Sequence, residues 1–503
     1  MDRAPPRGAP RDAVGQRWLA VFAFQAVLSA ATSALHLAAS PRGRRYPLLG
    51  VPAGLLLALH PLLACAATGL LALALLLSAS PRPRPPPLQR RALATALLAA
   101  AGALSVGAAA AILPEDAGWA AVAGLGFRGA VLGAVFAAHY FGRGRWLLQF
   151  PVVQRPLFYG LKMGLLPSGK RALKVSLQAF CLSFVLILLL PQQFRNGGSI
   201  GSQILTQISI FIVTAGVSFC LEISHHFVQV VHTRRCSFAP PESTAAAETN
   251  PTEFILETLE QSDPRSLIQY LAYQDLCVVS ECDLEPWRRG AFFEESGETY
   301  KRIVTACLKP LEEFTSIISR ALEEYLTESL SQQSILFSAF DDSQICTWCA
   351  RTLAGLTARS RQEDRYGVAQ LTGCNAAVMT TLLSALLAIE ACLGKKTNPQ
   401  PALGPENIKW ANFSTGRKGT GIGTGIAIAS TQKGGFHKKV YVMADVLRTS
   451  VYQIVSAFID DLRANAKPAS LEKNWISEGR KPVYGSQAVL VQKLSLFIEY
   501  HAV

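Results

Sequence analysis

Six long apolar stretches lie within the first 231 residues, and the mostly polar remainder is expected to contain none. They are Trp18–Ala39, Leu55–Leu77, Ala92–Leu113, Gly118–Tyr140, Ala172–Leu190 and Ile204–Leu221. Each approaches or exceeds the roughly 17 residues that a helix needs to cross a bilayer. Because only helices and closed barrels span lipid, the sequence predicts an all-α protein: a six-helix transmembrane bundle followed by a cytosolic α-helical domain.

The distribution of basic residues predicts the orientation. The connections that would share the side of the N-terminus hold sixteen Lys and Arg, whereas the alternate connections hold four. Cationic loops remain in the cytosol, so both termini are expected there. The first 235 residues hold 22 basic and 5 acidic residues, and the rest hold 26 and 30. The net charge of +13 is therefore assigned to membrane-facing loops, and direct nucleic-acid binding is not predicted.

Composition divides the chain into six segments. These are an N-terminal arm (1–17), the six-span domain (18–231), a linker (232–252), a helical cytosolic domain (253–393), a flexible basic linker (394–436) and C-terminal helices packing on that domain (437–503). Asp263-Pro264 predicts a helix start, with aspartate as N-cap. Further helices are predicted over Glu298–Leu330, Gln332–Thr357, Asp364–Leu393, Val440–Leu462 and Gln487–His501.

The segment before the fifth apolar stretch mixes apolar and basic residues. Pro156, Pro167 and the glycines of this segment argue against a single regular helix there. The segment is expected to lie at the headgroup layer, with its cations on anionic lipid. The candidate membrane-interface residues are Phe150, Arg155, Lys170 and Arg171.

One charge falls inside a predicted span. Arg128 could pair with Glu222, as a transporter would require, but the two differ by roughly 12 Å in expected depth. Arg128 is therefore expected to snorkel or to face the bundle, while Glu222 marks the cytosolic interface. Gly129-x-x-x-Gly133 favours close helix packing inside the bundle over a dimer contact.

No motif predicts catalysis, a cofactor or a metal. Cys346 and Cys349 form the only close cysteine pair, without a second pair to complete a zinc site, and are interpreted as buried thiols. Gly419–Gly425 lacks the register of a phosphate-binding loop and is interpreted as part of a flexible connector.

Four stretches carry a family resemblance: Phe150-Pro-Val-Val-Gln154, Ile268-Gln-Tyr-Leu-Ala-Tyr-Gln-Asp-Leu276, Glu363-Asp-Arg-Tyr-Gly-Val-Ala-Gln370 and the helix around Arg448–Leu462. They resemble the transmembrane nucleoporins of the nuclear division cycle type, which share this layout. The candidate partner-binding or tail-core residues are Tyr270, Tyr273, Asp275, Asp364, Arg365, Tyr366, Val451 and Phe458.

The resemblance implies a non-enzymatic protein of the nuclear pore membrane that anchors the pore scaffold and supports pore assembly. The implied partners are inner-ring and linker nucleoporins, a propeller nucleoporin of the aladin type and the lipid bilayer; self-association is left open. The alternative is a polytopic transporter or lipid-modifying enzyme of the endoplasmic reticulum. Transporters usually contain internal repeats and broken helices, and neither is found in this sequence.

Overall fold

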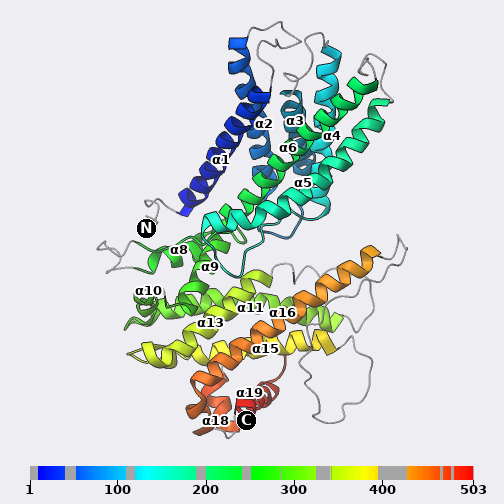
Figure 1. The fold of residues 1–503 in the computed structure, drawn as a ribbon. Helices are drawn as coiled ribbons and strands as arrows, with labels where there is room; N and C mark the ends of the chain where they lie inside the picture. The colour runs from blue at the N-terminus through cyan, green and yellow to red at the C-terminus, as the bar shows by residue number, and fades with distance from the viewer. Residues whose placement is uncertain are drawn as a thin grey trace. The chain divides into compact units, whose positions relative to one another are not determined.

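The computed structural model describes residues 10–39, 53–108, 119–188, 200–240, 251–283, 285–324, 340, 343–394, 427–464, 468–476 and 481–501. Among these residues every regular element is a helix, apart from an isolated bridge between Ser80 and Leu147 (Figure 1). The chain divides into two compact units: residues 1–236 with 264–271, and residues 237–263 with 272–503. The predicted all-α class is confirmed.

The first unit contains six long helices. They are α1 (Pro10–Ala39), α2 (Ala53–Ser78), α3 (Leu88–Ala108), α4 (Trp119–Gly142), α5 (Leu157–Leu188) and α6 (Ile200–Thr233). Each helix packs on its successor, and α1 also packs on α6. Helix α6 contacts all five others, so it forms the centre of the bundle.

Four helices of this unit, α2, α3, α4 and α6, are long and apolar enough in the described residues to cross a membrane. Helices α1 and α5 do not meet this criterion there, so the predicted number of six spans is approximate. Helix α15 (Cys374–Gly394) of the second unit also meets it, although no apolar run was expected beyond residue 231. Two thirds of its apolar window is buried against neighbouring helices such as α11 and α16, and such burial explains a helix that is apolar on all sides.

Helix α5 contradicts the prediction that residues 155–171 lack a regular helix. It runs without interruption from Leu157 to Leu188, with Pro167 inside it. Its small residues lie on the side that packs against α6: a Cβ at Gly164 would overlap the imidazole of His226, and one at Gly160 would lie 3.2 Å from Val230. These glycines, which were expected to break the helix, instead allow α5 and α6 to approach closely.

Helices α3 and α4 approach equally closely. A Cβ at Gly129 would overlap the carbonyl oxygen of Gly102, and one at Gly133 would overlap that of Leu98. Gly129 and Gly133 therefore pack inside the bundle, as predicted.

The second unit is built on four longer helices. They are α11 (Glu298–Glu324), α13 (Ser343–Glu363), α15 and α16 (Ala427–Ala457), which pack on one another in the pairs α13–α16, α11–α15, α11–α13 and α15–α16. Shorter elements complete the unit: α8 (Glu253–Gln261), α10 (Pro286–Gly290), η3 (Ala291–Phe293), α14 (Val368–Leu371), α17 (Ile459–Ala464), α18 (Pro468–Trp475) and α19 (Gln487–His501). Helix α9 (Leu267–Glu281) contributes residues to both units.

Several predicted boundaries in this region change. Helix α9 begins at Leu267 rather than after Asp263, because Arg265 takes a positive φ of 61° that a helix cannot include. The helix predicted over Asp364–Leu393 is interrupted at Gly367 and Gly373, whose φ angles are 67° and 69°. Helix α16 begins at Ala427, inside the predicted linker, whereas α19 has the predicted bounds. Residues 395–426, which carry most of the second predicted linker and the Gly419–Gly425 run, lie outside the described residues, as do residues 241–250 of the first linker.

Candidate functional site

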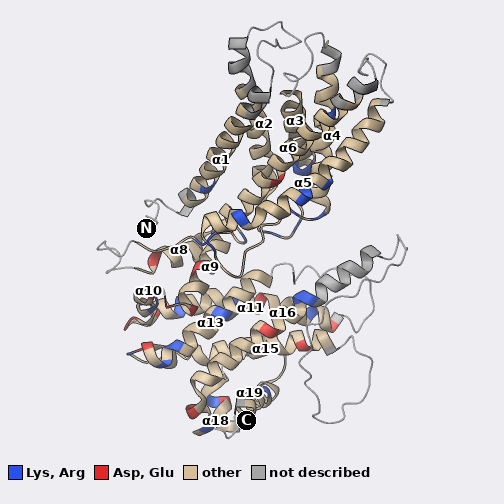
Figure 2. Ribbon diagram, in the orientation of Figure 1, with Lys and Arg blue, Asp and Glu red and all other residues tan. Residues whose placement is uncertain are grey.

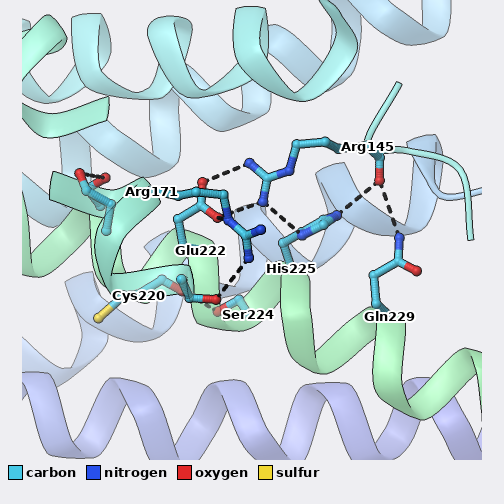
Figure 3. Close-up of polar contacts among 10 residues, drawn as sticks. Arg145, Arg171, Cys220, Glu222, Ser224, His225 and Gln229 are labelled. Atoms are coloured by element: carbon cyan, nitrogen blue, oxygen red, sulfur yellow. Dashed lines mark hydrogen bonds and ion pairs between the residues drawn. The ribbon is translucent and has the colours of Figure 1, made fainter. Parts of the chain in front are cut away.

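An ion-pair cluster around a buried carboxylate joins α5, α6 and the connection between α4 and α5 in the first unit (Figure 3). The carboxylate of Glu222 on α6 is fully buried and accepts two hydrogen bonds from the Arg145 guanidinium, at 2.7 and 2.6 Å. Arg171 on α5 donates a third through Nε at 3.2 Å. Paired and hydrogen-bonded, this carboxylate avoids the large cost of an isolated buried charge. Glu222 is therefore a buried anchor of two helices and a loop. Its place at the cytosolic interface stays a prediction.

The same face of α6 holds the connection between α4 and α5. His225 lies 3.1 Å from the Arg145 guanidinium through Nδ1 and 3.0 Å from the Arg145 carbonyl through Nε2. One turn later, Gln229 donates to the carbonyls of Arg145 and Leu147. Gln154 then donates to the Thr233 carbonyl at 3.4 Å. This polar stripe on α6, at positions 222, 225, 229 and 233, therefore fixes the loop to the bundle along three helical turns.

Arg128 lies apart from this cluster. It is buried, donates to Gln207 Oε1 on α6 at 2.8 Å, and has its guanidinium 6.0 Å from the centre of the Phe180 ring. Arg128 therefore faces the bundle, which is one of the two predicted placements, and Glu222 has other partners. Within the described residues, no group of three or more His, Cys, Asp or Glu is placed to hold a metal ion.

A second buried cluster lies in the second unit. Arg288 on α10 is almost fully buried and donates to Asp275 Oδ2 at 2.8 Å and to Glu285 Oε2 at 2.5 Å. Burial lowers the pKa of Arg288, but Asp275 and Glu285 more than compensate, so that the net direction is upward. Asp275 Oδ2 also accepts the backbone N–H of Phe238 at 3.0 Å, which fixes the chain that follows α6 onto α9.

The next residue, Arg289, ties α10 to α13. Its guanidinium binds both carboxylate oxygens of Glu363, at 2.7 and 2.6 Å, and Asp283 at 2.8 Å. The hydrogen bonds that Arg289 donates to the Glu363 carboxylate raise the pKa of Arg289. The sequence did not reveal Arg145, Arg288 and Arg289 as site residues, because an arginine in a polar context has no pattern that distinguishes a buried position from an exposed one.

Most of the predicted tail residues belong to the interior. Tyr273 is buried and its hydroxyl donates to the Ala306 carbonyl at 3.0 Å; burial raises its pKa. Val451 and Phe458 are buried as well, and the Phe458 ring lies 5.1 Å from that of Trp475. Tyr270, which groups with the first unit, is buried and stacks on Phe150 of the same unit at 5.6 Å. Asp275 is buried too.

Asp364 shapes an exposed turn between α13 and α15. Its Oδ2 accepts the backbone N–H of Ala369 at 2.8 Å, and Gly367 supplies the left-handed conformation between them. The turn presents Arg365 and Tyr366 to solvent, with Tyr366 54 % exposed. Leu371, at the end of α14, is 84 % exposed. Large side chains that a fixed turn keeps exposed to solvent, such as Tyr366 and Leu371, are suited to binding another protein.

The predicted membrane-interface residues separate into two groups. Arg155 and Lys170 are exposed, and their contact with lipid headgroups stays a prediction. Arg171 instead turns toward Glu222, and Phe150 stacks on Tyr270.

The cysteine pair gives a direct test of burial. Cys346 and Cys349 are buried on α13, and burial raises the pKa of Cys349; it also raises that of Cys277, to about 12. Because thiolates are the reactive form, a maleimide at neutral pH is expected to label exposed Cys282 and to leave Cys277 and Cys349 unlabelled until the protein is denatured. Peptide mass spectrometry measures this, and labelling of Cys349 at the rate of Cys282 would contradict the burial.

The exposed turn between α13 and α15 lies within a region that matches a known protein family. Residues 324–465 match the family model described as nucleoporin protein Ndc1-Nup, which includes α13 to α17 in the described part of the chain. The match confirms the resemblance to the nucleoporin family that was drawn from the sequence. A search of curated proteins gave no match to the chain.

Proposed function

We propose, from the match of residues 324–465 to this nucleoporin family, that the chain is a pore-membrane nucleoporin that anchors the nuclear pore scaffold and supports pore assembly. The observation that carries the proposal is the joining of a family-matched helical unit to a bundle of membrane-length helices in one chain. Inserted helices provide effectively irreversible attachment. The second unit then needs only modest affinity for soluble partners, because several copies act together around a ring.

The orientation is part of the same proposal. In the first unit, most of the blue Lys and Arg positions of Figure 2 lie along the first half of α5 and in the loops at that end of the bundle, and the helices are otherwise mostly uncharged. Arg143, Arg145, Arg155, Lys162 and Lys170 contribute to this basic end. Basic residues remain on the cytosolic side of a membrane, so we place both termini and the second unit on the cytosolic, pore-facing side.

The exposed turn between α13 and α15 is the proposed contact with scaffold proteins. It lies inside the family-matched region, and Arg365, Tyr366 and Leu371 are accessible there. Aromatic, arginine and well-packed apolar groups dominate the energetics of protein interfaces. The partners inferred from the resemblance are inner-ring and linker nucleoporins and an aladin-type propeller nucleoporin.

Proximity labelling from the C-terminus of the full chain tests this assignment. The unaltered protein is expected to give a punctate nuclear rim and to label pore components. The double variant Tyr366→Ala/Leu371→Ser should keep the rim signal through its membrane helices but reduce labelling of direct partners about tenfold, as expected when interface anchors are truncated.

Tyr500→Ala is the matched control, because Tyr500 is 65 % exposed and lies outside the family-matched region. Its labelling pattern should equal that of the unaltered protein. A reticular distribution that excludes the rim, or recovery of metabolic enzymes without pore components, would overturn the anchoring function. Equal labelling by the double variant and the control would overturn only the role of the turn.

A further inference from the structure

The first half of α5 has an exposed face on which large apolar and cationic side chains alternate. Phe158 is 69 % exposed, Met163 63 % and Leu166 69 %. Lys162 and Lys170 are exposed between and beyond them. At 100° per residue, these positions fall on one side of the helix.

The opposite face of α5 is already occupied by α6. Small residues recur every four positions on this face: Gly160, Gly164, Ser168 and Ala172. The last three are buried. The Ala172 carbonyl accepts a hydrogen bond from Ser218 of α6 at 3.0 Å. The packing of α5 on α6 therefore fixes which way the apolar and cationic face points, and none of the described helices covers it.

The length of α5 indicates where this face lies. Its 32 residues extend about 48 Å, whereas the hydrocarbon core of a bilayer is about 30 Å thick. After Lys174 the helix contains no charged residue, so we expect its first half, and not its second, to extend beyond the hydrocarbon. Exposed Phe and Met interleaved with Lys are typical of a helix at the boundary between headgroups and acyl chains.

The charge of this region selects the kind of lipid. Between Ala117 and Leu221 the sequence contains no Asp or Glu, while Arg155, Lys162, Lys170 and Lys174 are all exposed. Exposed cations in a stretch of sequence without acidic residues attract the phosphate and carboxylate groups of anionic phospholipids.

We propose that the exposed face of α5 formed by Phe158, Lys162, Met163, Leu166, Lys170 and Lys174 binds anionic phospholipids. The lysines contact the headgroups and the apolar side chains enter the adjoining leaflet. This inference rests on the proposed function only in placing the first unit in a membrane. Binding of anionic lipid would give the proposed membrane anchor a lipid preference. It would also hold the α5–α6 pair at a defined depth in the membrane.

Photocrosslinking of the full chain in lipid nanodiscs tests the proposal. Met163→benzoylphenylalanine places the probe on the proposed face, and the nanodiscs contain a minority of phosphatidylserine in phosphatidylcholine. Phosphatidylserine adducts, measured by mass spectrometry, are expected to exceed the mole fraction of that lipid about threefold or more. The matched control is Val185→benzoylphenylalanine, on an exposed position in the apolar half of the same helix, where adducts should follow the bulk composition.

The triple variant Lys162→Gln/Lys170→Gln/Lys174→Gln should return the Met163 adducts to the bulk composition. Adducts at Met163 that already follow the bulk composition, adducts only at Val185, or protein adducts at Met163 in cells would each overturn the lipid site. These outcomes leave the nuclear rim signal unaffected, so they are distinguishable from failure of the proposed function.

Discussion

Gly133→Ala is expected to destabilise the first unit by about 3 kcal/mol or more, the upper range for overpacking a close-packed interior. The added Cβ would overlap the Leu98 carbonyl oxygen and would lie 2.6 Å from its carbon and 2.7 Å from the Cα of Ala99. All three atoms belong to the backbone of α3, so no side chain can move aside, and the two helices must separate. The measurement is thermal or SDS-induced unfolding of the purified full chain, followed by helical circular dichroism.

Gly126→Ala is the matched control, because it makes the same substitution two turns earlier on α4. Its Cβ would meet only the Ala103 carbonyl oxygen, at 4.0 Å, which is an ordinary contact. Alanine also gains about 1 kcal/mol of helix propensity over glycine, so this variant should be neutral or slightly more stable. Equal stability of the two variants would show that α3 and α4 do not approach as described.

Asp275→Ala should destabilise the second unit by about 3–5 kcal/mol, since it removes one partner of a buried ion pair. Arg288 would retain Glu285 but lose Asp275 in a site from which water is excluded, and the N–H of Phe238 would lose its acceptor. For a unit of this size the expected fall in Tm is roughly 6–20 °C. Thermal unfolding of the full chain monitored by tryptophan fluorescence measures it.

Two further variants make the test specific. Asp283→Ala makes the same substitution at an aspartate that also pairs with arginines, Arg289 and Arg359, but is largely exposed. Because exposed ion pairs contribute little to stability, this variant should change Tm little. Adding Arg288→Met to Asp275→Ala removes the unpaired charge and should recover part of the lost stability. A double variant less stable than Asp275→Ala alone would contradict the account of Asp275 as the partner of a buried arginine.

The membrane helices and the long tail helices could be predicted because they depend on local composition. Apolar runs of membrane length predict helices, and the spacing in Val440–Leu462 predicts the amphipathic part of α16. The bounds of α19 were also predictable, since its apolar spacing is regular and its ends lie in polar sequence. Boundaries failed at Arg265, Gly367 and Gly373, where a backbone φ angle decides and the residue type alone does not.

The candidate site could be predicted from the sequence only in part. Tyr273, Val451 and Phe458 were recognised as important but could not be assigned to a core or to a surface, because amphipathic spacing does not identify what the apolar side packs on. Gly160 and Gly164 were misinterpreted as helix breakers, because a glycine that weakens an isolated helix also permits the close approach of a second one.

The sequence by itself determined that this protein is helical, that its first part contains membrane-length helices, and that its loops carry an excess of basic residues. These properties follow from composition and spacing along a single segment. Only the tertiary structure decided that Glu222 pairs with Arg145, that Arg288 is buried against Asp275, and that Tyr366 and Leu371 remain exposed. Glu222 and Arg145 lie far apart in the chain, and whether any of these side chains is buried depends on what the rest of the fold brings against it.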